Sequence, residues 1–312
     1  MVIEVHDLVK RYKELVALDH FSMSVNEGEI YGLLGPNGSG KSTVINCMLS
    51  LLRYEKGSVE IFGEKMHPNN YDIKKRIGLV MQNIGVYDEL TVEENIDYFC
   101  GLYIQDKKQR KQYVDEAIEF VGLEKFRNFR PKKLSGGLLH RLNLACGISH
   151  KPDLIILDEP TVAVDPQSRN RILDGIKQLR DEGKTIIYTT HYMEEVELIC
   201  DRLTIMDKGK EIITGTSDEI KAISQHGEVV KAEVFDLPVE TQLKIQQMPE
   251  VSGFHYHQGD LTVHFQKGAS HLMTLIGLFE DEHITLLNLT VQRPTLNDVF
   301  LEITGKELRD NV

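Results

Sequence analysis

A glycine-rich segment near the amino terminus has the composition and spacing of a phosphate-binding loop. It reads Gly35-Pro-Asn-Gly-Ser-Gly-Lys41-Ser42 and fits the pattern G-x-x-x-x-G-K-[ST]. Its glycines let the backbone wrap a phosphate so that successive N–H groups bind negative charge. Lys41 is expected to neutralise the β and γ phosphates of a nucleotide, and the Ser42 hydroxyl to ligate Mg²⁺. The pattern predicts nucleotide contacts from Gly35, Pro36, Asn37, Gly38, Ser39, Gly40, Lys41, Ser42 and Thr43.

Two adjacent carboxylates follow an apolar run in the middle of the chain. The segment Asp153-Leu-Ile-Ile-Leu-Asp158-Glu159-Pro predicts a buried strand with both acids at its end. Asp158 could hold Mg²⁺ through water, and Glu159 is placed to orient or deprotonate an attacking water. An acidic pair after a strand is also common in solvated loops, so the assignment depends on the phosphate loop in the same chain.

A third motif, Leu134-Ser135-Gly136-Gly137, precedes an amphipathic helix that is expected to begin near Leu138. Unpaired N–H groups at Ser135, Gly136 and Gly137 would make a second anion site at the start of this helix. A lone Ser-Gly-Gly is more often a flexible cap. Its position between the phosphate loop and the acidic strand favours the anion site over a flexible cap.

The elements that must hold these motifs alternate between strands and helices. Runs at 29–35, 77–81, 153–157 and 185–189 are continuously apolar or β-branched, which is the pattern of parallel strands covered on both faces. Helical spacing follows the phosphate loop over 42–52. A strand before the loop and a helix after it disfavour an incidental glycine-rich turn. We therefore predict an α/β domain with a parallel sheet and a phosphate-binding loop.

A helical insert is expected to interrupt this core over about 91–150, which has little strand character. Thr91-Val-Glu-Glu94 has capping-box spacing and opens a helix through Tyr103, and 111–126 is predicted to form another. The insert places the Ser-Gly-Gly motif between the core strands at 77–81 and 153–157.

A second, small α+β domain is expected after the nucleotide-binding part. From residue 228 the predicted order is strand, helix, hairpin, helix, strand, which is the split βαββαβ, ferredoxin-like arrangement. A last helix should start at Thr295, with Asp298 three residues on. The expected domain bounds are 1–223 and 228–312.

The predicted hairpin of the second domain gathers three histidines. With Gln258-Gly259 as a two-residue turn, His255, His257 and His264 share one face and the apolar residues share the other. These imidazoles could bind a regulatory metal ion, meet another subunit, or form a solvated face. An exposed sheet offers no obvious neighbouring groups to fix the rings by hydrogen bonds. This favours a contact with another subunit or a solvated face over a metal site.

Composition is that of a two-domain globular protein. The chain has 312 residues, of which 41% are hydrophobic and 27% charged, so a sizeable core is possible. No apolar run approaches the roughly 20 residues of a membrane helix, and the four cysteines form no C-x-x-C pair, as is usual in a reducing compartment. A formal charge of −12 disfavours a general affinity for nucleic acid. We expect a cytoplasmic protein.

The ordered set of motifs resembles the nucleotide-binding domain of ABC transporters. The order is the phosphate loop, Gln82 at a strand end, Leu-Ser-Gly-Gly, Leu-Asp-Glu-Pro, Asp165, and His191 in Thr-Thr-His. The resemblance covers about 1–223 and implies an α/β P-loop NTPase fold with a RecA-like core. It also implies ATP hydrolysis with ATP and Mg²⁺ as cofactors. It also implies a head-to-tail dimer, in which each ATP lies between one chain's phosphate loop and the other chain's Ser135 and Gly137.

The resemblance further implies roles for single residues. Tyr12 would stack on adenine, and Gln82 would contact Mg²⁺ and the attacking water. His191 would hold the γ-phosphate, completing a catalytic set with Glu159 and Lys41. Asp165 would lie at the dimer seam.

Two positions depart from the commoner family pattern, but neither removes a phosphate ligand. Leu138 stands where glutamine is frequent, and Ala163-Val164-Asp165 replaces Gly-Leu-Asp. The tail from Arg293 to Lys306 is similar to that of ATPases that partner separate six-helix permeases in drug, polyketide and sodium exporters of the daunorubicin-resistance type.

The resemblance implies partners and a location as well. A separate transmembrane permease would hold the protein at the inner face of the cell membrane, and a second ATPase, either another copy or a related chain, would be its dimer partner. The permease would dock in a groove between Gln82 and the helix from Thr91, over 83–90. The alternative is an ABC ATPase acting on ribosomes or DNA, but such proteins usually carry two cassettes or a long coiled coil, which this sequence lacks. The sequence does not indicate the transported substrate.

Overall fold

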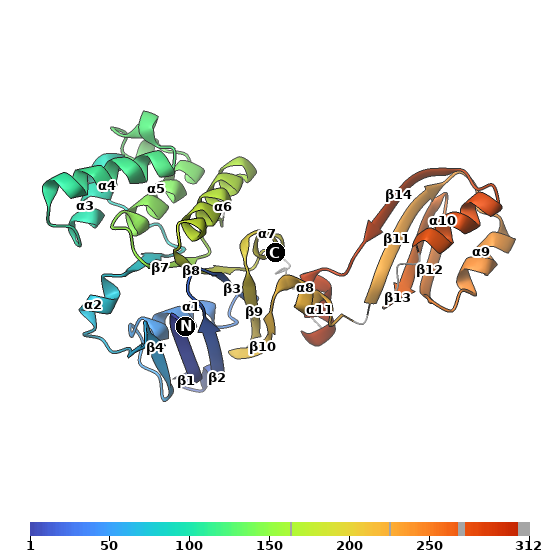
Figure 1. The fold of residues 1–312 in the computed structure, drawn as a ribbon, viewed down its shortest axis with the longest axis horizontal. Helices are drawn as coiled ribbons and strands as arrows, with labels where there is room; N and C mark the ends of the chain where they lie inside the picture. The colour runs from blue at the N-terminus through green and yellow to red at the C-terminus, as the bar shows by residue number, and fades with distance from the viewer. Residues whose placement is uncertain (163, 225, 268–271, 305–312) are drawn as a thin grey trace. The chain divides into compact units, whose positions relative to one another are not determined.

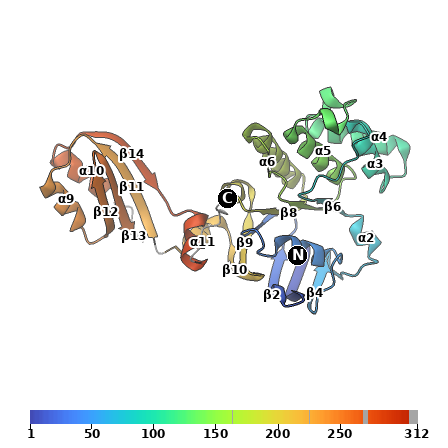
Figure 2. The same cartoon turned by 180° about the vertical axis from the view of Figure 1, so that it is seen from behind.

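The computed structural model describes residues 1–162, 164–224, 226–267 and 272–304, which form two compact units. The first unit is Met1–Ser217 and the second begins at Asp218; Figures 1 and 2 show them from opposite sides. The predicted domain end at residue 223 lies close to this division. Within the second unit, Ser224 Oγ donates to Glu302, and Lys267 Nζ donates to the Ala222 carbonyl.

A six-stranded sheet forms the centre of the first unit, in the order β10-β9-β3-β8-β7-β6. Neighbouring strands from β6 to β9 are parallel, and β10 pairs with β9 in the antiparallel sense. The four predicted buried strands are confirmed as β3, β6, β7 and β8. The strands are β3 (Ile30–Leu34), β6 (Ile77–Val80), β7 (Leu154–Asp158), β8 (Thr185–Thr190), β9 (Arg202–Asp207) and β10 (Lys210–Gly215).

Both faces of this sheet are covered, as continuous apolar strands require. Ile155 and Leu157 of β7 pack in a core that includes the helical insert, whereas Leu154 and Ile156 pack in a core with the amino-terminal elements. All four side chains are fully buried. The strand that ends in Asp158 is therefore fixed from two sides, which gives its end a defined position.

An antiparallel sheet, β2-β1-β4-β5, covers one face of the unit together with the helix after the phosphate loop. Its strands are β1 (Ile3–Tyr12), β2 (Leu15–Val25), β4 (Lys56–Ile61) and β5 (Glu64–Lys65). The helix, α1 (Lys41–Met48), is shorter than the predicted 42–52, because Ser50 takes a left-handed φ of 53° that ends it. The other helices outside the insert are α2 (Tyr71–Lys74), α6 (Pro166–Asp181) and α7 (Met193–Ile199).

The predicted helical insert consists of α3 (Val92–Gly101), α4 (Lys107–Phe120) and α5 (Gly136–Ile148), which lie together at one end of the unit (Figure 1). The capping box of Thr91 and Glu94 is confirmed, because each residue's side chain accepts from the other's backbone N–H. The helix expected at 111–126 begins earlier and ends earlier. Asp106 caps its start by accepting from Gln109 N at 2.7 Å, and Gly122, with φ 65°, ends it.

Helix α8 (Ser217–Lys221) spans the division between the units, and the second unit contains the predicted order of strand, helix, hairpin, helix, strand. Its sheet has the order β12-β13-β11-β14, and α9 and α10 are its two intervening helices. Thr295 caps the last helix by accepting from Asp298 N. The elements are β11 (His226–Val234), α9 (Val239–Gln246), β12 (Val251–His257), β13 (Asp260–Gln266), α10 (Leu272–Asp281), β14 (Leu286–Gln292) and α11 (Leu296–Thr304).

The hairpin register of this unit is the predicted one. His257 pairs with Asp260 across a turn whose two residues, Gln258 and Gly259, both have left-handed φ angles of 51° and 94°. Within the described parts of both units, no helix is long and apolar enough to cross a membrane.

Candidate active site

The phosphate loop connects the end of β3 to the start of α1, and its shape depends on two glycines that closely approach other backbone. A Cβ on Gly35 would lie 2.3 Å from the Met206 carbonyl oxygen, and one on Gly40 would lie 2.8 Å from that of Ala17. Gly40 also takes φ 112°, which L side chains rarely adopt. The β9–β10 turn supports the loop, because Gly209 N donates to Ser39 O at 2.8 Å.

Lys41 folds back over the loop that it follows. Its Nζ donates to Gly35 O at 2.7 Å and to Pro36 O at 3.2 Å, and the residue is 5% exposed. The same Nζ lies 3.4 Å from Glu159 Oε1. The ammonium group is therefore held at the phosphate loop and beside the carboxylate that the sequence marks as the base.

Ser42 and Asp158 are brought together from positions far apart in the sequence. Ser42 Oγ donates to Asp158 Oδ2 at 2.9 Å, while Thr189 Oγ1 donates to Asp158 Oδ1 at 2.6 Å. Asp158 is 2% exposed, so its carboxylate is held by these hydroxyls in a fixed orientation. The two oxygen ligands predicted for Mg²⁺ thus face one another.

Glu159 is buried and lies between two basic side chains. Its backbone has a left-handed φ of 50°, and its N–H donates to both the carbonyl and the hydroxyl of Thr189. Burial alone raises the pKa of Glu159, but His191 and Lys41 lower it by more, so the pKa lies below its ordinary value. The carboxylate is consequently ionised at neutral pH, as a base must be.

His191 reaches the same carboxylate from the loop after β8. Its Nδ1 lies 3.3 Å from Glu159 Oε2 but is not aligned for a hydrogen bond with any described residue. The ring packs against Tyr192, with centroids 4.1 Å apart. The imidazole remains partly exposed, and a ligand can therefore contact it.

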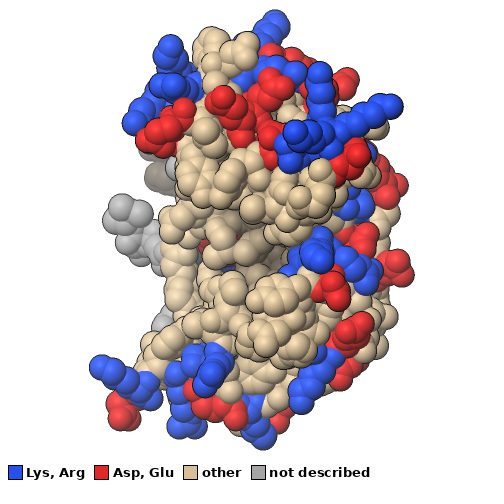
Figure 3. All heavy atoms as spheres, turned by 90° about the vertical axis from the view of Figure 1, so that its left-hand side faces the viewer, with Lys and Arg blue, Asp and Glu red and all other residues tan. Residues whose placement is uncertain are grey.

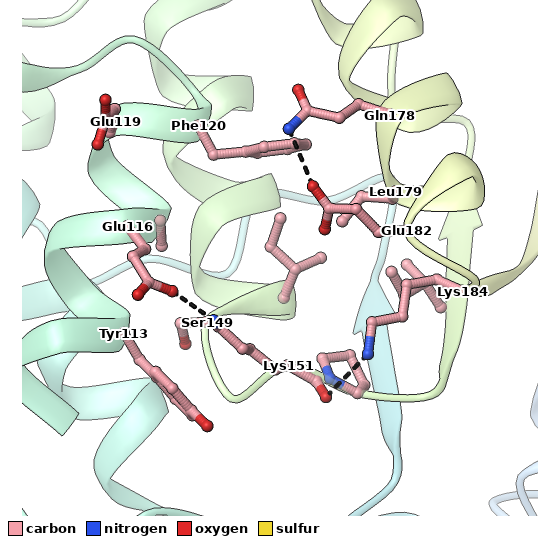
Figure 4. A pocket seen from close by; sticks show the side chains of 14 residues that line it. Tyr113, Glu116, Glu119, Phe120, Ser149, Lys151, Gln178, Leu179, Glu182 and Lys184 are labelled. Atoms are coloured by element: carbon pink, nitrogen blue, oxygen red, sulfur yellow. Dashed lines mark hydrogen bonds and ion pairs between the residues drawn. The ribbon is translucent and has the colours of Figure 1, made fainter. Parts of the chain in front are cut away.

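A hollow of about 480 Å³ opens over the phosphate loop. Tyr12 and Gln82 line it together with Lys41, Ser42 and Glu159. Four further lining residues belong to no recognisable motif and could not be predicted from the sequence: Leu15, Val16, Ala17 and Lys208. A larger hollow of about 620 Å³ lies between α4, α5 and α6 (Figure 4). It contains none of the predicted site residues, and its walls mix apolar groups with paired charges such as Lys151 and Glu116.

The Ser-Gly-Gly motif lies outside the hollow over the phosphate loop. Ser135 is exposed and caps α5, accepting from Leu138 N at 3.4 Å, and Gly136 is exposed beside it. A Cβ on Gly137 would lie 2.8 Å from Asp165 Oδ2, so Asp165 is next to this motif rather than in the hollow. Asp165 caps α6, accepting from Ser168 N at 2.9 Å, and this hydrogen bond lowers the pKa of Asp165.

The three histidines of the second unit share the polar face that the register predicted. His255 pairs with Thr262, and His264 lies opposite Gly253. No group of three His, Cys, Asp or Glu side chains is arranged to hold a metal ion in the described part of the chain. The metal alternative therefore gains no support from the arrangement of these side chains.

Comparison with known proteins shows which family this chain resembles. Residues 18–162 match the family model described as ABC transporter. Linearmycin resistance ATP-binding protein LnrL of Bacillus subtilis (strain 168) is 35% identical over 99% of this chain and 100% of its own length. Daunorubicin resistance ATP-binding protein DrrA3 of Streptomyces coeruleorubidus is 30% identical over 96% of this chain and 95% of its own.

A solved structure extends the likeness to the fold. The dimeric structure of a post-hydrolysis state of an ATP-binding cassette, bound to ADP and Pi, has a TM-score of 0.63 and 27% identity. The match covers 69% of this chain and 98% of the cassette. With a phosphate loop, a buried acidic strand end and relatives matched over 95% and 100% of their own length, this chain belongs to the family of ABC transporter ATP-binding proteins.

Proposed function

We propose that this chain is the ATP-hydrolysing subunit of an ABC exporter and that Glu159 activates the water that attacks the γ-phosphate of ATP. The observation that carries the proposal is the environment of this carboxylate. It is buried at the edge of the phosphate hollow, with Lys41 Nζ and His191 Nδ1 within 3.4 Å on its two oxygens. A buried, ionised carboxylate beside a phosphate site is suited to general base catalysis.

Lys41 and His191 would change partners when ATP binds. Both now contact the Glu159 carboxylate, and both are expected to contact the γ-phosphate in the complex. Since a phosphate carries more negative charge than a carboxylate, it competes for the two basic groups. Glu159 would then be free to accept a proton from water while Lys41 and His191 stabilise the charge on the transferred phosphoryl group.

The proposed Mg²⁺ site consists of Ser42, Asp158 and Gln82. Hydroxyl, carboxylate and amide oxygens are the ligands that this hard cation prefers, and Ser42 Oγ and Asp158 Oδ2 are 2.9 Å apart. Bound there, Mg²⁺ would neutralise charge on the β and γ phosphates. Gln82 is exposed on the rim of the hollow, where its amide could contact both the ion and the attacking water.

The second half of the ATP site is proposed to come from another copy of this chain. Ser135 and Gly136 are exposed, outside the hollow that contains the phosphate loop of the same chain. Backbone N–H groups at the start of α5 present positive partial charge to a phosphate. A head-to-tail dimer, with Asp165 at its seam, would bring this helix start onto the ATP of the partner.

The proposed docking surface for a permease is a hollow of about 280 Å³ beside Gln82. Its walls include Asn83 and Gly85 and the end of α3. Asn143 accepts from Gly85 N at 3.1 Å and donates to Met81 O at 3.3 Å, so the backbone on both sides of Gln82 is fixed to α5. A permease that displaced this surface would therefore also move the backbone at Gln82. Through such a permease the protein would lie at the inner face of the membrane.

A nucleic-acid partner is the weaker alternative. Figure 3 views the face that carries α2 and α3, where basic and acidic side chains alternate around the rim and the hollowed centre is largely uncharged. A protein that grips a phosphate backbone presents a continuous basic surface instead. The view therefore favours a protein partner at this face.

The test is ATP hydrolysis by the purified full chain and its Glu159→Gln variant. Glutamine keeps the shape but cannot accept the proton, so kcat should fall by about a hundredfold or more while ATP still binds. Asp153→Asn is the matched control, because Asp153 is an exposed carboxylate just before the same strand, paired with Arg76. Near wild-type hydrolysis by Glu159→Gln would show that another group is the base.

A further inference from the structure

Glu195 in α7 is a buried carboxylate that does not line the phosphate hollow. It is 3% exposed, and its oxygens accept three hydroxyl hydrogen bonds. Thr161 Oγ1 donates to Oε1 at 2.8 Å, and Tyr188 OH and Thr190 Oγ1 donate to Oε2 at 2.7 and 3.0 Å. Arg169 Nε, 3.4 Å from Oε1, supplies the opposite charge. Because a buried carboxylate is costly unless it is fully hydrogen-bonded, this arrangement is fixed.

One of the three donors fixes the backbone around His191. Thr190 immediately precedes His191 and is 1% exposed. Its hydroxyl has a single hydrogen, which it gives to Glu195, so its oxygen accepts from the N–H of Tyr192 at 3.0 Å. The chain is thereby held on both sides of His191. Loss of the Glu195 acceptor would let the Thr190 hydroxyl rotate and release this hold.

A second donor fixes the loop that contains Glu159. Thr161 lies two residues after Glu159, is fully buried and directs its hydroxyl to the other oxygen of Glu195. The backbone turns at Glu159, which has a left-handed φ of 50°. The carboxylate therefore connects, through its two oxygens, the loop of the proposed base and the loop of the proposed γ-phosphate ligand.

Arg169 adds a third connection. Its guanidinium carbon lies 4.8 Å from the centroid of the Tyr192 ring, in addition to its ion pair with Glu195. Arg169 belongs to α6, the helix that Asp165 caps. The same carboxylate thus orients the residue after His191 and the first turns of the helix that starts beside the Ser-Gly-Gly motif.

We propose that Glu195 is a positioning residue, which holds the loops of Glu159 and His191 at a fixed separation through Thr161 and Thr190. The inference rests on the proposed roles of Glu159 and His191 in hydrolysis. Because Glu195 contacts Thr161 and Thr190 and none of the proposed ATP ligands, its effect should fall on the alignment of the attacking water and the γ-phosphate more than on ATP affinity. Small displacements of reacting groups lower rates strongly, whereas binding depends on many contacts.

The test compares isosteric variants of the full chain in steady-state ATP hydrolysis and ATP binding. Thr190→Val and Glu195→Gln should each lower kcat by about tenfold, with the Kd for ATP within about twofold of wild type. Thr190→Ser keeps the hydroxyl and should restore most of the rate. This rescue separates the hydrogen bond from side-chain packing, even where Glu195→Gln folds poorly.

Thr204→Val is the matched control, because Thr204 is another fully buried threonine of the same core, bonded to Tyr31 and Thr214 and not to Glu195. It should lower the thermal unfolding midpoint as Thr190→Val does but leave kcat near wild type. If the wild type is active, two results would overturn the inference. One is a Thr190→Val variant with the full kcat of wild type, and the other is a Thr204→Val variant whose kcat falls as much as that of Thr190→Val. An inactive wild type, or an active Glu159→Gln, would instead overturn the proposed function.

Discussion

The phosphate loop is shaped by single residues that leave no room for side chains. Gly40 has both a left-handed backbone and a neighbouring carbonyl oxygen in the place of a Cβ. Lys41 Nζ reaches the carbonyl oxygens of the same loop only because the backbone turns at this point. We therefore expect nucleotide affinity to depend on the absence of a side chain at Gly40 as well as on Lys41.

Gly40→Ala should weaken ATP binding by tenfold or more, because the loop must move away from the Ala17 carbonyl and misplace Lys41. The control is Gly183→Ala, which has a similar left-handed φ of 87° but open space around its Cβ. Both variants should lose about 1 kcal/mol of stability from backbone strain. Isothermal titration with ATP, with denaturant unfolding of both, separates the two effects. Unchanged ATP affinity in Gly40→Ala would contradict this account of the loop.

The sequence predicted the residues of recognisable motifs and missed those placed by packing. Lys41, Ser42, Asp158 and Glu159 stand at motif spacing, and they lie together in the fold. Lys208 lines the same hollow but comes from a turn between two strands, where no local pattern distinguishes a ligand contact from a solvated lysine. The hydrogen-bond and ion-pair partners of Glu195 are likewise separated in the sequence: they include Thr161, Arg169 and residues of β8. Only the folded chain brings them together.

At the scale of elements, α5 is joined to the central sheet by the histidine that follows it. His150 Nε2 donates to the Ile77 carbonyl of β6 at 3.3 Å, and its ring stacks on Tyr103 with centroids 4.0 Å apart. Burial lowers the pKa of His150 to about 4. The neutral ring is thus part of the contact between the helical insert and the core.

The buried, neutral His150 predicts that the free energy of unfolding falls with acid over a defined range of pH. The unfolded chain takes up a proton at His150 near pH 6.5, whereas the folded chain does so only near pH 4. Above pH 6.5 the burial of His150 therefore does not reduce the free energy of unfolding. As the pH falls from 6.5 to 4, this free energy decreases by about 3 kcal/mol in total. His150→Leu should flatten the dependence of unfolding free energy on pH in this window. Denaturant unfolding between pH 4 and 8 that gave the same slope for both proteins would contradict the assignment.

Long, continuous elements were predicted better than interrupted ones. The parallel strands and the capping box at Thr91 follow from apolar runs and cap spacing, and both are confirmed. The sheet of β1 and β2 escaped prediction, because left-handed residues at Asp7 and His20 and irregular register break the alternation of apolar and polar positions. Helix ends were displaced where a single cap, such as Asp106, set the start.

In the assembled protein, we propose, each ATP needs two copies of this chain. The phosphate loop with its hollow and the exposed start of α5 are two separate surfaces of one chain. In a head-to-tail pair each surface would meet its complement, and the pair would close only with ATP between them. Turnover per chain should then rise with protein concentration when no permease is present.

Sedimentation of the full-length Glu159→Gln variant tests this claim most directly, because the variant should bind ATP without consuming it. We expect ATP and Mg²⁺ to drive it to a dimer, and we expect the double variant Glu159→Gln with Ser135→Arg to bind ATP yet not to dimerise in response. Ser252→Arg, an exposed serine in β12, is the matched control and should dimerise normally. A Glu159→Gln protein that binds ATP but shows no ATP-dependent association, or a Ser135→Arg variant that associates as well as the control, would contradict the shared-site account.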